Sequence, residues 1–315
     1  MTLDLKNKKI WIAGHSGMVG SALIRRLSHE QCMILTIDHK DMDLTDQHAV
    51  DNWVAKHKPD IIFLAAAKVG GILANATYPV DFLQINLMIQ NNIISTAHRN
   101  NVEKLVFLAS ACMYPRNASQ PMTEETIMTG ELEPTNEAYA IAKIAGTKLC
   151  QAYRKQYDDN FITVVPTNSY GPNDNFCLET GHVPAAIMVK AHTAKIETTP
   201  TITLWGNGQA LRDFIYVDDM ADAIVFAARH YNSDSPLNIG SGTETSIAEL
   251  AEVIKDAVGY KGNIVYDTTK PNGAPRKHLD CQKLNQLGWQ ASTELEIGFK
   301  KTYKWFCQNN IKKQT

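Results

Sequence analysis

The chain has 315 residues, of which 44% are hydrophobic and 20% charged, and its 31 Lys and Arg nearly balance its 33 Asp and Glu. These values exclude a collagenous or coiled-coil chain and disfavour disorder, and the lack of a basic excess disfavours a nucleic-acid-binding protein. The six cysteines form no Cys-x-x-Cys pair, no run reaches ~18 uncharged apolar residues, and the first nine residues do not resemble a signal peptide. We therefore expect a cytoplasmic globular protein with reduced thiols, no membrane association and no metal site.

Short apolar runs alternate with segments of helical period over the first 170 residues. The runs predict buried strands at 10–13, 33–37, 60–65, 104–109 and 161–166. Helices are predicted at about 17–29, 81–99 and 137–157. Such alternation, with strands apolar on both faces, predicts a doubly wound α/β fold of the Rossmann type. Its parallel sheet would carry helices on both faces and a ligand crevice at the carboxyl ends of the strands.

The pattern loosens after Pro172, with predicted helices at 183–194, 218–229, 246–257 and 294–308. We expect a smaller C-terminal domain that covers the crevice. The predicted dinucleotide-binding domain comprises 1–167 plus about 212–235, and the predicted substrate domain comprises about 168–211 plus 236–315.

A glycine-rich turn separates the first predicted strand from the first predicted helix. It reads Gly14, His15, Ser16, Gly17, Met18, Val19, Gly20. Glycines let the backbone approach a pyrophosphate, which the positive end of the helix dipole then stabilises. Asp38 ends the second predicted strand, 18 residues after Gly20, where a carboxylate can bind a ribose. This context favours dinucleotide binding over a simple loop.

Tyr139 and Lys143 lie four residues apart at the start of a predicted helix, so both side chains share one face. An ammonium near a phenol favours the phenolate, so we expect a lowered pKa for Tyr139 and acid/base activity near neutral pH. Ser110 ends the fourth predicted strand and could bind the same substrate oxygen. A Tyr–Lys pair alone is common on exposed helices, but with the glycine turn it favours a reductase site.

Together these residues resemble the extended short-chain dehydrogenase/reductase superfamily. Four stretches resemble one of its families, the GDP-L-fucose synthases, along essentially the whole chain: 65–72, 133–143, 166–172 and 271–277. The resemblance implies 3,5-epimerisation of GDP-4-keto-6-deoxy-D-mannose and NADPH-dependent reduction at carbon 4, which give GDP-L-fucose. It also implies a homodimer paired through the helices that start near Asp81 and Tyr139, with apolar material from Leu83, Leu87, Ile94 and Ile141, although these could equally face their own sheet.

The resemblance assigns the epimerase base to Cys112 and the acid to His182. A thiol and an imidazole, with reference pKa values of ~8.5 and ~6.5, suit proton exchange across one carbon. Taken alone, each would more often be a structural residue. Ser110 and Tyr139 would stabilise the enolate, and Lys143 would hold the nicotinamide ribose.

The resemblance also supplies binding residues. It assigns coenzyme contacts to Ala65, Ala66, Pro166 and Asn168, and substrate contacts to Asn168, Lys190, Trp205, Arg212 and Lys277. Arg212 suits a diphosphate best, because its guanidinium offers a fork of donors.

Two departures from the family pattern leave alternatives open. Ser16 stands where the family often has a cation for the 2′-phosphate of NADPH, and Asp38 suits the ribose hydroxyls of NAD. NADP(H) and NAD(H) are therefore almost equally favoured, and we predict a relaxed coenzyme preference. The loop 177–181 also differs, so a 4-reductase acting on another GDP-4-keto sugar, such as a heptose or a 3,6-dideoxy hexose, with or without epimerase activity, is the alternative function. A dehydratase would need an acidic residue after Ser110, and a sensor without catalysis would not need both Tyr139 and Lys143.

Overall fold

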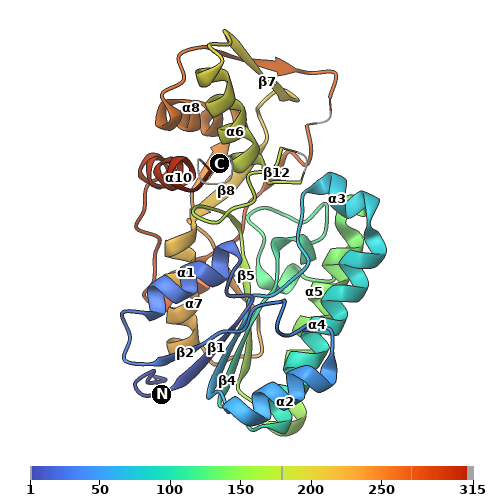
Figure 1. Cartoon of the computed structure of the whole chain (residues 1–315). Coiled ribbons are helices and arrows are strands. Elements are labelled where there is room, and N and C mark those ends of the chain that lie inside the picture. Colours follow the sequence, from blue (N-terminus) through green and yellow to red (C-terminus); the bar gives the residue numbers. More distant parts are fainter. Residues whose placement is uncertain (1, 179, 271, 311–315) are drawn as a thin grey trace.

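A six-stranded parallel sheet forms the centre of the protein in the computed structural model, which describes residues 2–178, 180–270 and 272–310 (Figure 1). Its strand order is β2-β1-β3-β4-β5-β9. The strands are β1 (Lys9–Ala13), β2 (Met33–Leu35), β3 (Ile61–Leu64), β4 (Lys104–Leu108), β5 (Phe161–Pro166) and β9 (Leu237–Ile239). All neighbours in this sheet are parallel. The predicted α/β class and the five predicted strands are confirmed, whereas β9 was missed because three residues show no clear period.

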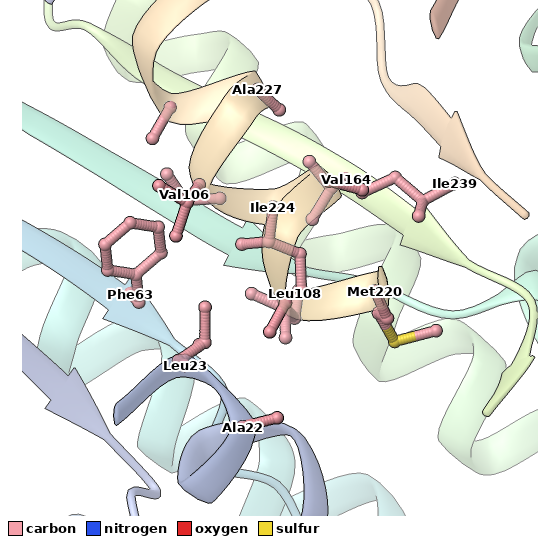
Figure 2. Close-up of a cluster of buried hydrophobic side chains, with 14 of the residues drawn as sticks. Ala22, Leu23, Phe63, Val106, Leu108, Val164, Met220, Ile224, Ala227 and Ile239 are labelled. Carbon is pink, nitrogen blue, oxygen red and sulfur yellow. The ribbon is translucent and has the colours of Figure 1, made fainter. Parts of the chain in front are cut away.

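Helices cover both faces of this sheet. Alternate residues of β1 face opposite sides, so Ile10 and Ile12 join one core while Trp11 joins the other. The first core is covered by α1 (Met18–Leu27) and α7 (Val217–His230), and the second by α2 (Gln47–His57), α4 (Pro79–Arg99) and α5 (Glu137–Tyr157). Figure 2 shows the first core, where Leu23 of α1 and Ile224 of α7 approach Val106 and Leu108 of β4.

A second group of elements lies beyond the carboxyl ends of the strands (Figure 1). The strand β8 (Leu211–Tyr216) pairs with β6 (Asn168–Tyr170), β10 (Glu244–Ser246) and β12 (Arg276–Lys277), while β7 (Thr201–Trp205) pairs with β11 (Asn263–Asp267). The helices α6 (Val183–Ile196), α8 (Ile247–Val258) and α10 (Leu295–Asn310) contribute to a third core. The short helices are α3 (Ile72–Thr77) and α9 (Gln282–Gln286).

The division into two domains stays a proposal. The segment after residue 236 contributes β9 to the parallel sheet and most of its remaining elements to the second group. No helix in the described part of the chain is long and apolar enough to cross a bilayer.

Two glycines give the turn after β1 its shape. Gly14 has φ +88°, and a Cβ there would lie 2.5 Å from the backbone nitrogen of Ala66, so the turn lies directly against the chain that leaves β3. A Cβ on Gly20 would overlap the carbonyl oxygen of Gly14. A Cβ on Gly17 would meet only that oxygen, at 3.6 Å. Gly14 and Gly20 are therefore required for packing, whereas Gly17 faces open space.

Gly20→Ala and Gly17→Ala should separate these roles. The first places a methyl group against fixed backbone, and overpacking of this kind costs about 1–3 kcal/mol of unfolding free energy. The second meets no clash and should cost less, about 0.5 kcal/mol, because Gly17 is the N-cap of α1 and glycine is preferred to alanine there. Urea denaturation of the protein without coenzyme measures both, and equal losses would contradict this assignment.

Candidate active site

The carboxyl ends of four neighbouring strands gather the predicted site residues at one edge of the sheet. The glycine turn follows β1, Ala65 and Ala66 follow β3, Ser110 follows β4, and Pro166 ends β5. Because these strands are parallel and adjacent, residues far apart in the sequence become neighbours. This edge is where the fold class predicts a ligand crevice.

The turn after β1 fits the diphosphate of a dinucleotide. Gly17 is the N-cap of α1 and provides no side-chain cap for its N–H groups. With open space at its Cα, the backbone can be approached closely, and the helix N-terminus offers donors to an anion. Gly14 and Gly20 set the shape of the turn, so His15, Ser16, Met18 and Val19 lie around this position.

Asp38 lies beside the glycine turn rather than apart from it. Its carboxylate oxygen is 3.4 Å from Nε2 of His15, and the Asp38 side chain is half exposed. The carboxylate that would bind ribose hydroxyls is therefore next to the glycine turn, where it would repel a 2′-phosphate.

Ser110, Tyr139 and Lys143 come together where α5 crosses the end of β4. The Lys143 ammonium is buried and donates a hydrogen bond to the carbonyl of Leu108 (2.9 Å). It lies 5.8 Å from the centre of the Tyr139 ring and 4.9 Å from that of Phe107. The Tyr139 side chain is hydrogen-bonded to Ser110, and its ring packs edge-on against Phe82.

The expected lowering of the Tyr139 pKa is wrong for this structure. Desolvation raises the pKa of Tyr139, an ionised Cys112 would raise it further, and the hydrogen bond to Ser110 opposes both effects only in part. Desolvation also lowers the pKa of Lys143 to about 8. Burial thus keeps Tyr139 in its neutral form, whereas Lys143 keeps its charge below about pH 8. Tyr139 is accordingly a proton donor at neutral pH.

Cys112 lies in a short 3-10 turn, residues 111–113, directly after Ser110. Its backbone N–H donates to the Ser110 hydroxyl (3.3 Å), and its sulfur accepts a hydrogen bond from the side-chain amide of Asn136 (3.2 Å). Ser110 therefore touches both Cys112 and Tyr139. One hydroxyl, one phenol and one thiol share a single location, as the sequence predicted.

His182 comes from the second group of elements, where it is the N-cap of α6 and is exposed. The loop before it contacts the loop after β3, because the N–H of Gly71 donates to the carbonyl of Thr180 (3.1 Å). No hydrogen bond joins His182 to Ser110, Cys112 or Tyr139 among the residues that the structure describes; Glu179 in this loop is not one of them. Burial raises the pKa of Asp174, and its electrostatic interaction with His182 opposes that shift.

The three predicted substrate-binding cations and the predicted indole lie on the second group of elements. Arg212 on β8 pairs in register with Lys277 on β12, and Lys190 on α6 donates to the carbonyl of Thr203 (2.9 Å). None of these cations forms an ion pair within the described ranges. Trp205 ends β7 with two thirds of its surface exposed. Asn168, which starts β6, donates to the carbonyl of Asp213 (3.1 Å) and links this side to β5. Unpaired cations of this kind suit a diphosphate.

Comparison with known proteins identifies the family. The model of the NAD dependent epimerase/dehydratase family matches residues 10–240. The chain belongs to this family. A GDP-L-fucose synthase of Sinorhizobium fredii is 52% identical over 305 residues, 97% of each chain. Among solved structures, a GDP-6-OMe-4-keto-L-xylo-heptose reductase from C. jejuni has a TM-score of 0.92 at 34% identity and covers 98% of this chain and 100% of its own. A GDP-L-fucose synthetase from Naegleria fowleri bound to NADP has a TM-score of 0.91 at 29% identity, with 99% and 97% covered.

The resemblance drawn from the motifs is thereby confirmed for the family. Two residues that the sequence reasoning did not select also lie at the site, Asn136 beside Cys112 and Asp174 beside His182. Asn136 could have been suspected, since it directly precedes the helix that carries Tyr139. The sequence shows no signal that connects Asp174 with a histidine eight residues later.

The charge of Lys143 should control the alkaline limb of the pH profile. Because burial lowers the folded pKa of Lys143 to about 8, its ammonium is present below that pH and is lost as the pH rises through it. We expect kcat/KM for coenzyme-dependent reduction to fall through about pH 8.

Lys143→Arg keeps the charge, since arginine stays protonated to pH ~12, and should move this limb upward by more than about one pH unit. Lys148→Arg, on an exposed position of the same helix, is the matched control. An unmoved limb in Lys143→Arg would assign the titration to another group.

Proposed function

We propose that this protein converts GDP-4-keto-6-deoxy-D-mannose to GDP-L-fucose, as a 3,5-epimerase and an NADP(H)-dependent 4-reductase. The observation that carries the proposal is the cluster of Ser110, Cys112 and Tyr139 at the end of β4. It occurs in a chain that is 52% identical to a GDP-L-fucose synthase over nearly its full length. The enzyme is an oxidoreductase that acts on a nucleotide sugar.

Epimerisation uses the acidity of the carbons on either side of the 4-keto group. The Cys112 thiolate removes a proton from one face of the carbon and becomes a thiol, while the electron pair moves to the ketone oxygen. Ser110 and Tyr139 donate hydrogen bonds to the resulting enolate oxygen. Protonated His182 then delivers a proton to the opposite face and becomes neutral, which inverts the centre. Because its pKa is raised, Tyr139 keeps the proton that this hydrogen bond needs.

Reduction takes place at the same oxygen. When bound, the reduced nicotinamide supplies the hydride for carbon 4. Tyr139 gives its proton to the developing alkoxide, and Ser110 holds that oxygen in place. Lys143 remains fixed to the Leu108 carbonyl, with its charge 5.8 Å from the centre of the ring on which negative charge develops. One phenol thus serves both reactions in its protonated form.

The substrate's diphosphate would lie against the cations of the second group of elements. Arg212 and Lys277 stand side by side on paired strands and both lack a carboxylate partner within the described residues. Lys190 donates to the carbonyl of Thr203 and Arg212 to that of Leu211 (2.7 Å), but the guanidinium has further N–H donors, so Arg212 contributes more. Trp205 presents an exposed ring close to Lys270, whose ammonium is 5.8 Å from its centre.

We assign NADP(H) as the coenzyme, with a preference over NAD(H) weaker than a dedicated 2′-phosphate site would give. The use of NADP(H) is supported by the solved Naegleria fowleri structure, which is bound to NADP. The weaker preference is supported by the half-exposed Asp38 and by the serine, rather than a cation, at position 16. The exposed Lys40, two residues after Asp38, is a cation available to a phosphate, and the His15 imidazole offers a ring nitrogen nearby.

A cytoplasmic homodimer remains our proposal for the assembly. On α4 and α5, the side chains of Val80, Met88 and Ile141 are exposed although apolar, and Leu83 and Leu87 are partly exposed. A two-fold pairing of these helices would bury them. Ile94 is fully buried in its own core, so it contributes nothing to such a surface.

Isotope exchange tests the reaction. With substrate in heavy water, the wild-type protein should incorporate deuterium at carbons 3 and 5, as read by NMR of the product. Cys112→Ala and His182→Asn should each lower incorporation at one or both carbons by at least about 100-fold, the usual size of a lost general acid or base.

Cys32→Ser, outside the site, is the control and should exchange normally. Reduction without deuterium at either carbon in the wild type would instead establish the alternative, a 4-reductase for a related GDP-4-keto sugar. The structural similarity to a heptose reductase, with a TM-score of 0.92, makes this 4-reductase activity the alternative function that the experiment must exclude.

Coenzyme selectivity tests the role of Asp38. We expect the ratio of kcat/KM for NADPH over NADH to stay below about 100, which corresponds to ~2.7 kcal/mol. Asp38→Asn removes the repulsion toward a 2′-phosphate and should raise that ratio about tenfold or more. Asp41→Asn makes the same charge change at an exposed position of the same loop and should leave the ratio unchanged. A wild-type ratio above 100 would defeat the predicted relaxation.

A further inference from the structure

Asn136 occupies a helix cap position without capping the helix. It is the N-cap of α5, and asparagine there normally accepts a hydrogen bond from an N–H of the first turn. Here the side chain makes no such bond. It reaches instead across to the 3-10 turn after β4, where its Nδ2 donates to the sulfur of Cys112 at 3.2 Å.

The other end of the same amide is left without a partner. The Oδ1 of Asn136 is buried and accepts no hydrogen bond in the structure. Buried polar atoms in this state are uncommon in folded proteins and often lie at functional sites. The helix loses a cap and an acceptor is left unsatisfied, while the one bond that forms goes to the thiol proposed as the base.

The local backbone holds this contact in place. Residues 134–136 form a 3-10 turn, in which the N–H of Asn136 donates to the carbonyl of Glu133 (3.1 Å). On the other side, the backbone N–H of Cys112 is bound to Ser110. Both partners thus belong to short turns that are held by local hydrogen bonds.

The bond matters most when the sulfur is charged. A hydrogen bond to an ionised acceptor is about twice as strong as one to a neutral acceptor, so an amide N–H favours thiolate over thiol. Tyr139 is a titratable neighbour, since an ionised Cys112 would raise the pKa of Tyr139. A Tyr139 that keeps its proton places no negative charge beside the sulfur, and the amide of Asn136 donates to that sulfur.

We propose that Asn136 is a positioning residue for the epimerase step, which orients the Cys112 sulfur and stabilises its thiolate through the Nδ2–H bond. This inference rests on the proposed function, since it assumes that Cys112 is the base. It predicts an asymmetry between two variants. Asn136→Asp keeps the shape of the side chain but places a carboxylate beside the sulfur, whereas Asn136→Ala only removes the donor.

The test uses the intact protein and three measurements. Iodoacetamide alkylation of Cys112 at pH 7, followed by mass spectrometry of its peptide, reports the thiolate directly. We expect the rate to fall about 10-fold in Asn136→Ala and about 100-fold in Asn136→Asp, the range expected for one hydrogen bond to a charged group. Deuterium incorporation from heavy water should fall in the same order, and the pH at half-maximal alkylation should rise most in Asn136→Asp.

NADPH binding, followed by fluorescence, and the thermal midpoint separate this role from a structural one. NADPH binding should stay near wild type in both variants, because Asn136 caps no helix N–H group, whereas the thermal midpoint reports the cost of burying the new carboxylate in Asn136→Asp. Asn232→Asp adds the same charge at an exposed position and should change none of the measurements. Wild-type alkylation in Asn136→Asp would overturn the proposal. Slower alkylation with unchanged deuterium incorporation would support the Asn136–thiolate bond but refute Cys112 as the base, and with it that part of the proposed function.

Discussion

The hydrogen bond from the buried Lys143 ammonium to the Leu108 carbonyl is the contact on which the candidate site depends. It joins α5 to the end of β4 and so fixes the distance between the two segments that carry the chemistry. With that distance set, Tyr139 meets Ser110, and Asn136 meets Cys112. A charged donor to a backbone carbonyl in a desolvated site is strong because water cannot compete for either partner.

Desolvation also decides how the site handles protons. The same burial that strengthens hydrogen bonds raises the pKa of Tyr139 and lowers that of Lys143, so neither group ionises as easily as it would in water. A protonated phenol can donate to an enolate oxygen during epimerisation and to an alkoxide during reduction. The thiolate would be the one anion of this cluster, supported by an amide rather than by a cation.

The predicted coenzyme-binding and substrate-binding residues lie on different groups of elements. The parallel sheet supplies the glycine turn for a dinucleotide, and the elements beyond its carboxyl ends supply the unpaired cations Arg212 and Lys277. Contacts between the loop after β3 and the loop before His182 connect the two sides. His182 thus follows a loop that is hydrogen-bonded to the loop after β3, whereas Cys112 and Tyr139 lie at the sheet edge itself.

The sequence by itself determined the elements whose signal is local: five apolar strands, the helices that bear Gly17–Gly20 and Tyr139–Lys143, and the family motifs around them. Short elements such as β9 and β12 could not be predicted, because two or three residues acquire strand geometry only from their neighbours in the sheet. Tertiary structure alone decided the sign of the Tyr139 pKa shift. Sequence spacing correctly placed an ammonium near the phenol, but desolvation depends on every atom that surrounds the pair. The partnership of Asn136 with Cys112 likewise follows from how α5 packs against β4, which brings together residues 24 positions apart.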